Sequence, residues 1–349
     1  MSEKRYENLD GLRAICCLAI IAMHVRANTS YEVTWGGYIY DVIIPSWTEF
    51  VYLFLMISAF GMCCGYYNKF LTTEIDMEAF YSRRYKKIVP FFGLLILIAL
   101  VLDRTLESLY EAIIEITLLH GLLPNNNLSL LGVSWTLGVI FVFYLVFPYF
   151  TYLLRSKKRA WISLLISLLI TYLCEIYYFT DKFVVEGFAY RHCFLYCAPF
   201  FMLGGIIYIY KENIENWIKQ YSLVCTLLCL ALSIMYYVLP TEIGSTSILV
   251  WKLMLVYGSW LCLLISCRTK ILDNKVMHYL GSISLEMYLA QMIAFRVIEK
   301  LGLLYVFGQG WIGYICACIM VVGSLIIFVI LARRIINILE IKILKSAKG

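Results

Sequence analysis

The sequence predicts an all-α integral membrane protein with about ten transmembrane helices and an additional amphipathic or re-entrant helix on the outer side. The 349 residues are 62% hydrophobic and only 15% charged, whereas soluble globular chains average about 45–50% and 25%. The apolar residues form solid blocks of the length that a bilayer-spanning helix requires. Barrel strands would instead alternate apolar and polar residues over about ten positions.

The distribution of Lys and Arg sets the predicted topology. The loops 68–87, 155–159, 211–219 and 268–278 are rich in Lys and Arg, whereas the alternate loops hold only Arg104, Lys182 and Arg191. Short cytoplasmic loops collect basic residues, so both termini are expected in the cytoplasm of a multi-pass plasma-membrane protein. The predicted spans are 12–30, 47–67, 88–102, 131–154, 160–179, 193–210, 220–239, 247–267, 279–300 and 311–334.

The segment 106–123 is not expected to span the membrane. If it did, the basic loop 155–159 would lie outside. Glu107, Glu111 and Glu115 recur every four residues and therefore share one helix face. Such a helix suits the outer membrane surface or a lid over a cavity.

The chain is expected to form one domain over residues 1–349, without an internal repeat. The first apolar run contains Arg13 and His24 and lacks a small-residue cleavage site, so it is expected to stay in the membrane. Cys193 and Cys197 lie one helical turn apart beside His192, but no fourth ligand is in view, so no metal site is predicted. No nucleic-acid partner is expected, and a homodimer is compatible with the sequence.

Arg13 and His24 are the first candidates for chemistry, because ionisable residues are costly inside a membrane helix. Eleven residues rotate a helix by about 1,100°, which places both on one face about 16 Å apart along the axis. The arginine would serve an anionic group near the cytoplasmic mouth, and the histidine a proton transfer deeper in. The alternative is a snorkelling arginine and a hydrogen-bonded packing histidine.

A basic cluster precedes the third span. Arg83, Arg84 and Lys87 suit a phosphate-bearing cofactor, because Arg can hold phosphate bidentately. Ordinary anchoring by the positive-inside rule is the alternative. Asp10 lies three residues before Arg13 and can pair with it across one turn.

Further candidates lie in later spans. Ser284, Tyr288 and Gln291 form a polar stripe in the ninth span, and Glu286, near its cytoplasmic end, can neutralise an arginine or reach the headgroups. Trp135 in the fourth span and Arg191 before the sixth are substrate-binding candidates, with packing or headgroup anchoring as the alternative.

Five segments resemble the motifs of the membrane-embedded acyltransferase 3 family. They are LDGLR at 9–13 with an R-x10-H pattern from Arg13 to His24, LFLMISAF at 53–60, RRYKKIVP at 83–90, WTLGVIFVFYLVFP at 135–148 and LGSISLEMYLAQ at 280–291. The resemblance implies transfer of an acyl group, usually acetyl, from cytoplasmic acyl-CoA to a hydroxyl of an extracytoplasmic or membrane-associated acceptor such as a cell-envelope carbohydrate or lipid-linked sugar. It assigns the family's essential arginine and histidine to Arg13 and His24, and its basic stretch to Arg83 and Arg84.

The chain departs from the family pattern at three places. Ile140 and Phe141 stand where many members have two glutamates, Gln291 replaces a late histidine, and Ser58–Ala59 replaces a serine–glycine pair. The first two departures leave open the acceptor class and any auxiliary acid or base.

Two other function classes are compatible with the sequence. The chain is also similar to the membrane half of the vancomycin-resistance serine/alanine racemases, which is thought to move serine, so transport of a small polar molecule such as serine is the alternative. A transporter is expected to show inverted repeats or broken helices. A sensing subunit that has lost catalysis is the third class, against which the presence of Arg13 and His24 argues.

Overall fold

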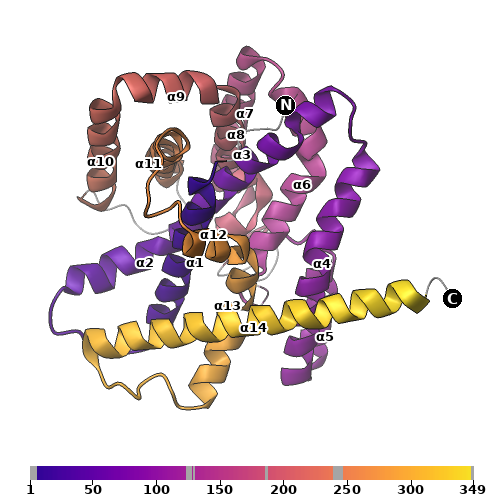
Figure 1. Cartoon of the computed structure of the whole chain (residues 1–349), viewed down its shortest axis with the longest axis vertical. Coiled ribbons are helices and arrows are strands. Elements are labelled where there is room, and N and C mark those ends of the chain that lie inside the picture. The colour runs from indigo at the N-terminus through magenta and orange to yellow at the C-terminus, as the bar shows by residue number, and fades with distance from the viewer. Residues whose placement is uncertain (1–5, 123–127, 129, 185–187, 239–246, 347–349) are drawn as a thin grey trace.

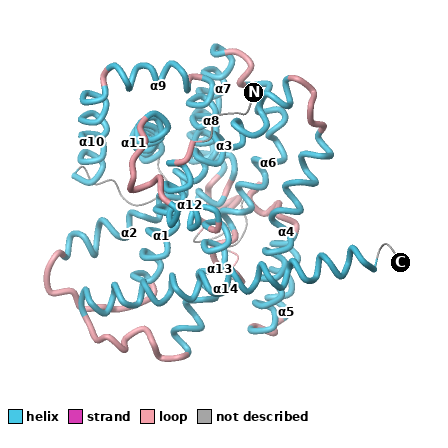
Figure 2. Tube along the Cα trace, in the orientation of Figure 1, coloured by secondary structure: helices cyan, strands magenta, loops and turns pink. Residues whose placement is uncertain are grey.

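A computed structural model describes residues 6–122, 128, 130–184, 188–238 and 247–346, so parts of the predicted loops 103–130 and 180–192 lie outside the described residues. Figure 2 shows helices joined by loops, and no strand among the described residues. The long helices are α1 (Asn8–Ala27), α3 (Phe50–Leu71), α4 (Met77–Leu102), α6 (Trp135–Leu153), α7 (Lys157–Leu173), α8 (Phe194–Ile209), α10 (Ser222–Val238), α11 (Ser247–Ser266), α13 (Ser284–Lys300) and α14 (Gly310–Ser346). The shorter elements are η1 (Ile39–Ile43), α2 (Ile44–Ser46), η2 (Trp47–Glu49), α5 (Leu106–Ile116), η3 (Cys174–Tyr178), η4 (Tyr190–His192), α9 (Lys211–Gln220) and α12 (Lys275–Ser282).

The predicted all-α membrane class is confirmed, and each predicted span overlaps one of the long helices, although 279–300 also includes the end of α12. Among the described residues, seven helices are long and apolar enough to cross a membrane, or eight if the bent pair α8–α9 forms one span. The apolar helix α10 is shorter, and α13 carries charged residues in both end turns. The count of ten spans therefore stays a prediction.

Helix α3 lies at the centre of the fold and packs against α1, α6, α8 and α11 (Figure 1). Its residues Leu53, Met56 and Phe60 are fully buried. Gly204 allows α8 to approach closely, because a Cβ there would clash with the carbonyl oxygen of Met56. In lipid there is no hydrophobic driving force between helices, so the close packing that a small residue permits stabilises their contact.

The break between α12 and α13 differs from the single predicted span 279–300. The helix is interrupted at Ile283, and the Ser284 hydroxyl donates to the Gly281 carbonyl across the break (2.9 Å). Asn274 caps the start of α12 by accepting from the Val276 and Met277 amides. The interruption buries Ser284, whereas Ser282 is exposed, and both serines line the cavity described below.

Helices α1 and α12 cross with their backbones in direct contact. A Cβ at Gly11 would clash with the Leu272 carbonyl, and one at Gly281 would clash with the Asp10 carbonyl. Gly281 thus lets α12 approach α1, and Gly11 lets the loop before α12 do so, although the two glycines are 270 residues apart in the chain. Only a residue without a Cβ permits so close an approach.

Helix α5 does not qualify as a span, as predicted, but its orientation is opposite to that of a surface helix. Glu111 and Glu115 face the protein interior and are 8% and 0% exposed, whereas the apolar Leu106 and Ile113 are 87% and 58% exposed. Of the three glutamates predicted to share a face, Glu111 and Glu115 point inward together, whereas Glu107 in the first turn is exposed. This direction does not fit a helix on the membrane surface, one of the two predicted placements. The carboxylates find hydrogen-bond partners inside the fold, which leaves the apolar side to face outward.

Helix α14 crosses the lower part of Figure 1, and its C-terminal end projects beyond the rest of the chain. Its 37 residues correspond to about 55 Å, which exceeds the ~30 Å hydrocarbon thickness of a bilayer. Arg333 lies on this helix and reaches α13 at Glu286. A distant part of the chain thereby places an exposed cation on Glu286, which lines the cavity described next.

Candidate functional site

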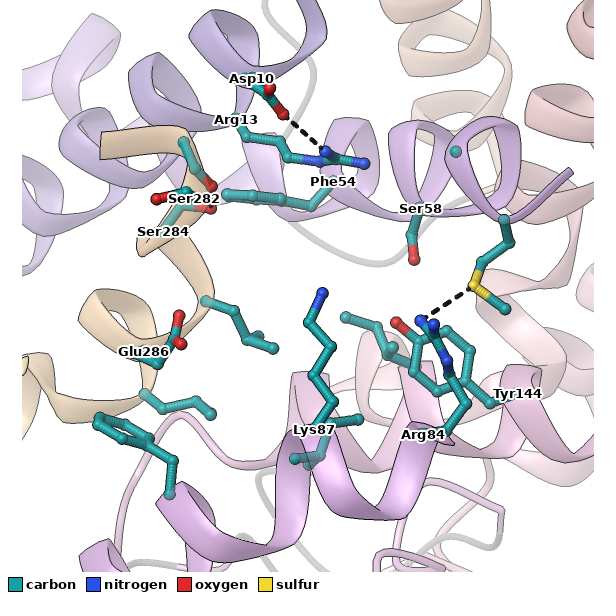
Figure 3. Close-up of a pocket in the computed structure, with 18 of the residues that line it drawn as sticks. Asp10, Arg13, Phe54, Ser58, Arg84, Lys87, Tyr144, Ser282, Ser284 and Glu286 are labelled. Atoms are coloured by element: carbon teal, nitrogen blue, oxygen red, sulfur yellow. Dashed lines mark hydrogen bonds and ion pairs between the residues drawn. The ribbon is translucent and has the colours of Figure 1, made fainter. Parts of the chain in front are cut away.

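Two polar cavities lie along α1, one at each of its predicted functional residues. Arg13 lines a cavity of about 450 Å³, the arginine cavity, together with the charged residues Asp10, Arg84, Lys87 and Glu286 (Figure 3). His24 lines a cavity of about 250 Å³, the histidine cavity, together with Thr48, Trp135, Arg191, His192 and Tyr288.

Arg13 is held by a chain of polar contacts that begins on its own helix. Its Nη1 donates to Asp10 Oδ1 at 3.2 Å, which confirms the predicted pair. The other oxygen of Asp10 lies 3.6 Å from His278 Nδ1, and His278 Nε2 lies 2.8 Å from Asp273 Oδ1. The hydrogen bond to His278 lowers the pKa of the Asp273 carboxyl. Sequence reasoning missed His278, whose only signal was that it is one of four histidines in the chain.

The structure separates the three basic residues of the predicted phosphate site. Arg84 and Lys87 line the arginine cavity, whereas Arg83 is exposed and does not. Residues three apart share a helix face and their immediate neighbour does not, which accounts for the separation. Figure 3 shows Lys87 pointing into the centre of the cavity, between Glu286 and Arg84.

Two tyrosines surround the Arg84 guanidinium. Nη2 donates to the Tyr66 hydroxyl at 2.6 Å, and the guanidinium carbon lies 4.9 Å from the Tyr66 ring centre and 5.7 Å from that of Tyr144. Nε of Arg84 has no hydrogen-bond partner among the described residues. Tyr66 and Tyr144 thus orient a cation that lines the cavity.

Glu286 is neutralised by an arginine, one of the two roles predicted for it. Its Oε1 lies 2.5 Å from Arg333 Nη2, which also donates to the Ser282 carbonyl at 3.1 Å. Of the cavity's carboxylates, Asp10 faces Arg13 and Glu286 faces Arg333. Among the described residues, Arg84 and Lys87 form no ion pair, so the arginine cavity carries an excess of positive charge.

The histidine cavity is built around Trp135. The indole stacks on the His192 ring with 4.6 Å between centroids and 24° between planes, and the Arg191 guanidinium carbon lies 5.5 Å from the indole. Arg191 Nη1 donates to Thr48 Oγ1 at 3.2 Å. Burial, followed by the charge of Arg191, lowers the pKa of His192 to about 3, so this imidazole is neutral. Trp135 and Arg191 thus share a cavity with His24, as substrate-binding roles would require.

The contact between Phe54 and Tyr288 lies between the two cavities. Phe54 lines the arginine cavity, Tyr288 lines the histidine cavity, and their ring centroids are 6.4 Å apart. The Tyr288 hydroxyl shares a 2.6 Å hydrogen bond with the Thr136 hydroxyl, which holds the ring in place. The shared face of Arg13 and His24 predicts one passage along α1, but the two residues line separate cavities, with the Phe54–Tyr288 contact between them.

The polar stripe predicted on α13 is divided among three environments. Ser284 lines the arginine cavity, Tyr288 lines the histidine cavity, and Gln291 lines neither. Gln291 is 1% exposed, and neither of its amide atoms has a hydrogen-bond partner among the described residues. A substrate contact at Gln291 has no cavity to support it.

The inward carboxylates of α5 hold the segment that leads into α6. Glu111 accepts from the Leu130 amide and Glu115 from the Ser134 hydroxyl, each at 2.7 Å. Burial raises the pKa of Glu115 to about 7. The segment carries Gly132, which lines the histidine cavity, so α5 supports one wall of that cavity from behind.

Within the described residues, no group of three or more His, Cys, Asp or Glu side chains is arranged to hold a metal ion. The thiols of Cys193 and Cys197 donate instead to the Leu122 and Arg191 carbonyls.

Residues 6–332 match a family model described as an acyltransferase domain. No curated protein and no solved structure matches the chain.

Proposed function

We propose that this chain, which belongs to the acyltransferase 3 family, transfers an acyl group, in the simplest case acetyl, from cytoplasmic acyl-CoA to a hydroxyl of an extracytoplasmic or membrane-associated acceptor. The acceptor would be a cell-envelope carbohydrate or a lipid-linked sugar. The supporting observation is the pair of polar cavities on one face of α1, with cations in one and His24 in the other. By the positive-inside rule, the arginine cavity opens toward the cytoplasm and both termini lie there.

The arginine cavity would bind the donor. Arg84 and Lys87 have no carboxylate partner among the described residues, and the guanidinium of Arg84 is held in a fixed orientation by Tyr66. A preorganised guanidinium binds phosphate oxygens through paired hydrogen bonds, and a lysine adds a point charge. Arg13, predicted as catalytic, would contribute to donor binding, because it lines this cavity and not the one with His24.

His24 would act as general base in the second cavity. Its imidazole would take the proton of the acceptor hydroxyl while the hydroxyl oxygen attacks the thioester carbonyl. Collapse of the tetrahedral intermediate breaks the carbon–sulfur bond, and the leaving thiolate recovers the proton from His24. The products are an acyl ester and free CoA, so atoms and charges balance without a further reactant.

This mechanism requires the acyl-pantetheine arm to pass the contact between Phe54 and Tyr288. The eleven residues from Arg13 to His24 correspond to about 16 Å along α1, a distance that an extended pantetheine arm can cover. Rotation of either ring would join the two cavities, and at rest the rings would keep water away from the thioester. The separation of the cavities thus fits a donor site that opens for each transfer.

The test uses the full-length protein in lipid nanodiscs and two measurements. Acetyl-CoA binding is measured by calorimetry, and acyl transfer by incorporation of labelled acetyl into membrane material. His24→Ala should bind acetyl-CoA as wild type does but lose transfer. Arg84→Gln should weaken donor binding by about tenfold or more, whereas Arg83→Gln, its exposed neighbour, serves as the control. Full transfer by the His24 variant, or equal effects of the two arginine variants, would contradict the proposal.

Transport of a small polar molecule such as serine is the second candidate, and the break at Ile283 favours it. Interrupted helices at the substrate site are typical of transporters, and Ser282 and Ser284, on either side of this break, line the arginine cavity. Proteoliposomes containing the protein should not take up labelled serine if it is an acyltransferase. Uptake that requires no acyl-CoA would establish transport instead.

A further inference from the structure

Arg191 is positioned in the histidine cavity by two neighbours from different elements. It lies in η4 and reaches Thr48 in η2 with Nη1, while its guanidinium carbon lies 5.5 Å from the ring of Trp135 in α6. A hydrogen bond and an aromatic contact together fix the plane of the guanidinium. Because Trp135 and Thr48 also line the cavity, the charged group lies at its wall.

The charge of Arg191 has no carboxylate to balance it at close range. Among the described residues it forms no ion pair, and its buried Nε has no hydrogen-bond partner. Glu49 feels the charge of Arg191 electrostatically, but it lies outside the cavity and makes no close pair with it. By contrast, Arg13, Arg26 and Arg333 each face a carboxylate within 3.2 Å.

No Asp or Glu is found among the described residues that line the histidine cavity. Its polar groups are two imidazoles, two hydroxyls, an indole and the guanidinium, so its net charge is positive. Arg191 is half-buried, and its buried Nε without a partner is costly unless an anion completes the hydrogen bonds. A neutral sugar hydroxyl would leave that charge uncompensated, whereas an oxyanion would accept from Nε and balance it.

The size of the cavity limits how far this anion lies from the reacting hydroxyl. A volume of about 250 Å³ is smaller than a typical ligand pocket, so only one end of an acceptor can enter. Because Arg191 and His24 both line this small space, a group bound to one lies within a few bonds of a group bound to the other. The hydroxyl at His24 and an oxyanion at Arg191 therefore belong to the same small moiety.

We propose that the acceptor carries a carboxylate or phosphate next to the hydroxyl that is acylated, and that Arg191 binds this oxyanion. The proposal rests on the proposed function and specifies its acceptor class. A uronic acid would supply the carboxylate, and a polyol phosphate the phosphate. In both cases Arg191 would orient the acceptor so that its hydroxyl meets the His24 imidazole.

The experiment measures the binding of two matched pairs of probes to the full-length protein in nanodiscs. Glucuronate is compared with glucose, and glycerol 3-phosphate with glycerol, each at millimolar concentration by microscale thermophoresis. We expect at least one anionic probe to bind more tightly than its neutral counterpart, and the pair that responds identifies the source of the oxyanion. High salt should weaken this binding.

Variants connect the binding to this residue. Arg191→Gln should weaken binding of the anionic probe roughly tenfold to a hundredfold, which is the loss expected for a charged hydrogen bond. Arg191→Lys, which keeps the charge, should retain part of it. The control is Arg159→Gln, because Arg159 also lies on an aromatic ring, that of Tyr152, but lines neither cavity. Melting curves verify that each variant is folded, and the lysine variant serves if the glutamine variant is not.

The proposal is overturned if no anionic probe binds better than its neutral partner. It is also overturned if the Arg191 variants bind the anions as wild type does. Acetyl-CoA binding measured on the same samples separates this proposal from the preceding one. Anion binding without acetyl-CoA binding would contradict the donor assignment and leave the role of Arg191 intact, and the reverse would contradict the acceptor class alone.

Discussion

Replacing Gly281 with alanine tests whether the contact between α1 and α12 positions Arg13. The added Cβ would lie 2.6 Å from the carbonyl carbon and 2.9 Å from the Cα of Asp10. Non-bonded carbons require about 3.5–4.0 Å, so the two backbones must separate by roughly 1 Å. Neither side of the clash is a flexible side chain, so we expect the upper part of the ~1–3 kcal/mol range measured for overpacked cores.

The displacement should also affect donor binding. Asp10 and Arg13 lie on the same helix and move together, so separating α1 from α12 by about 1 Å would lengthen the 3.6 Å approach of Asp10 to His278 and displace Arg13 relative to the cavity wall that α12 and α13 supply. We therefore expect Gly281→Ala to melt several degrees below wild type and to bind acetyl-CoA more weakly. Binding is measured by calorimetry at a temperature where the variant remains folded.

The matched control is Gly323→Ala, which changes a helical glycine with no atom within 4 Å of the added Cβ. This variant should melt at or slightly above the wild-type temperature, because alanine favours the helix by ~1 kcal/mol over glycine. If Gly281→Ala melts like wild type and binds acetyl-CoA normally, the tight contact does not position Arg13 and the reasoning is refuted.

Two further predictions concern pH and the partition between the cavities. The pKa of Glu115 is raised from 4.5 to about 7 in the folded protein. Between these two pH values the folded state therefore binds more protons than the unfolded state. The free energy of unfolding should fall as pH rises from 4.5 to 7, by at most on the order of 3 kcal/mol. The melting temperature of wild type should fall between pH 5 and 8, and that of Glu115→Gln should fall less. Equal pH dependence of the two proteins would contradict a raised pKa at Glu115. Tyr288→Phe removes the bond to Thr136, worth about 1 kcal/mol, and should raise acetyl-CoA hydrolysis without acceptor about fivefold. Released CoA is measured with a thiol reagent, and an unchanged rate would show that this hydrogen bond does not keep the partition closed.

Features that depend on one helix were predicted well from the sequence. Arg13 and Asp10 lie one turn apart and do form a pair. The helical period also explains why Arg84 and Lys87 line the same cavity, although the prediction that grouped Arg83 with them did not apply that period. Glu111 and Glu115 of α5 share the buried face, as their spacing requires. In each case the information lies within four residues along the chain, where helix geometry alone sets the direction of a side chain.

Features that depend on two helices were missed or misjudged. His278 approaches Asp10 from a helix at the other end of the chain, and Tyr66 orients Arg84 from α3. The inward direction of α5 depends on Ser134 and the Leu130 amide, which no periodicity within α5 reveals.

The membrane class, the succession of apolar helices and the shared stripe of Arg13 and His24 follow from the sequence alone, because composition and helical period determine them. The tertiary structure decided that this stripe faces two cavities instead of one. A period of 3.6 residues specifies which side chains share a face, but it does not specify which aromatic rings a neighbouring helix brings against that face. Phe54 and Tyr288 come from helices more than 200 residues apart, and their contact exists only because the packing of the bundle places α3 and α13 together.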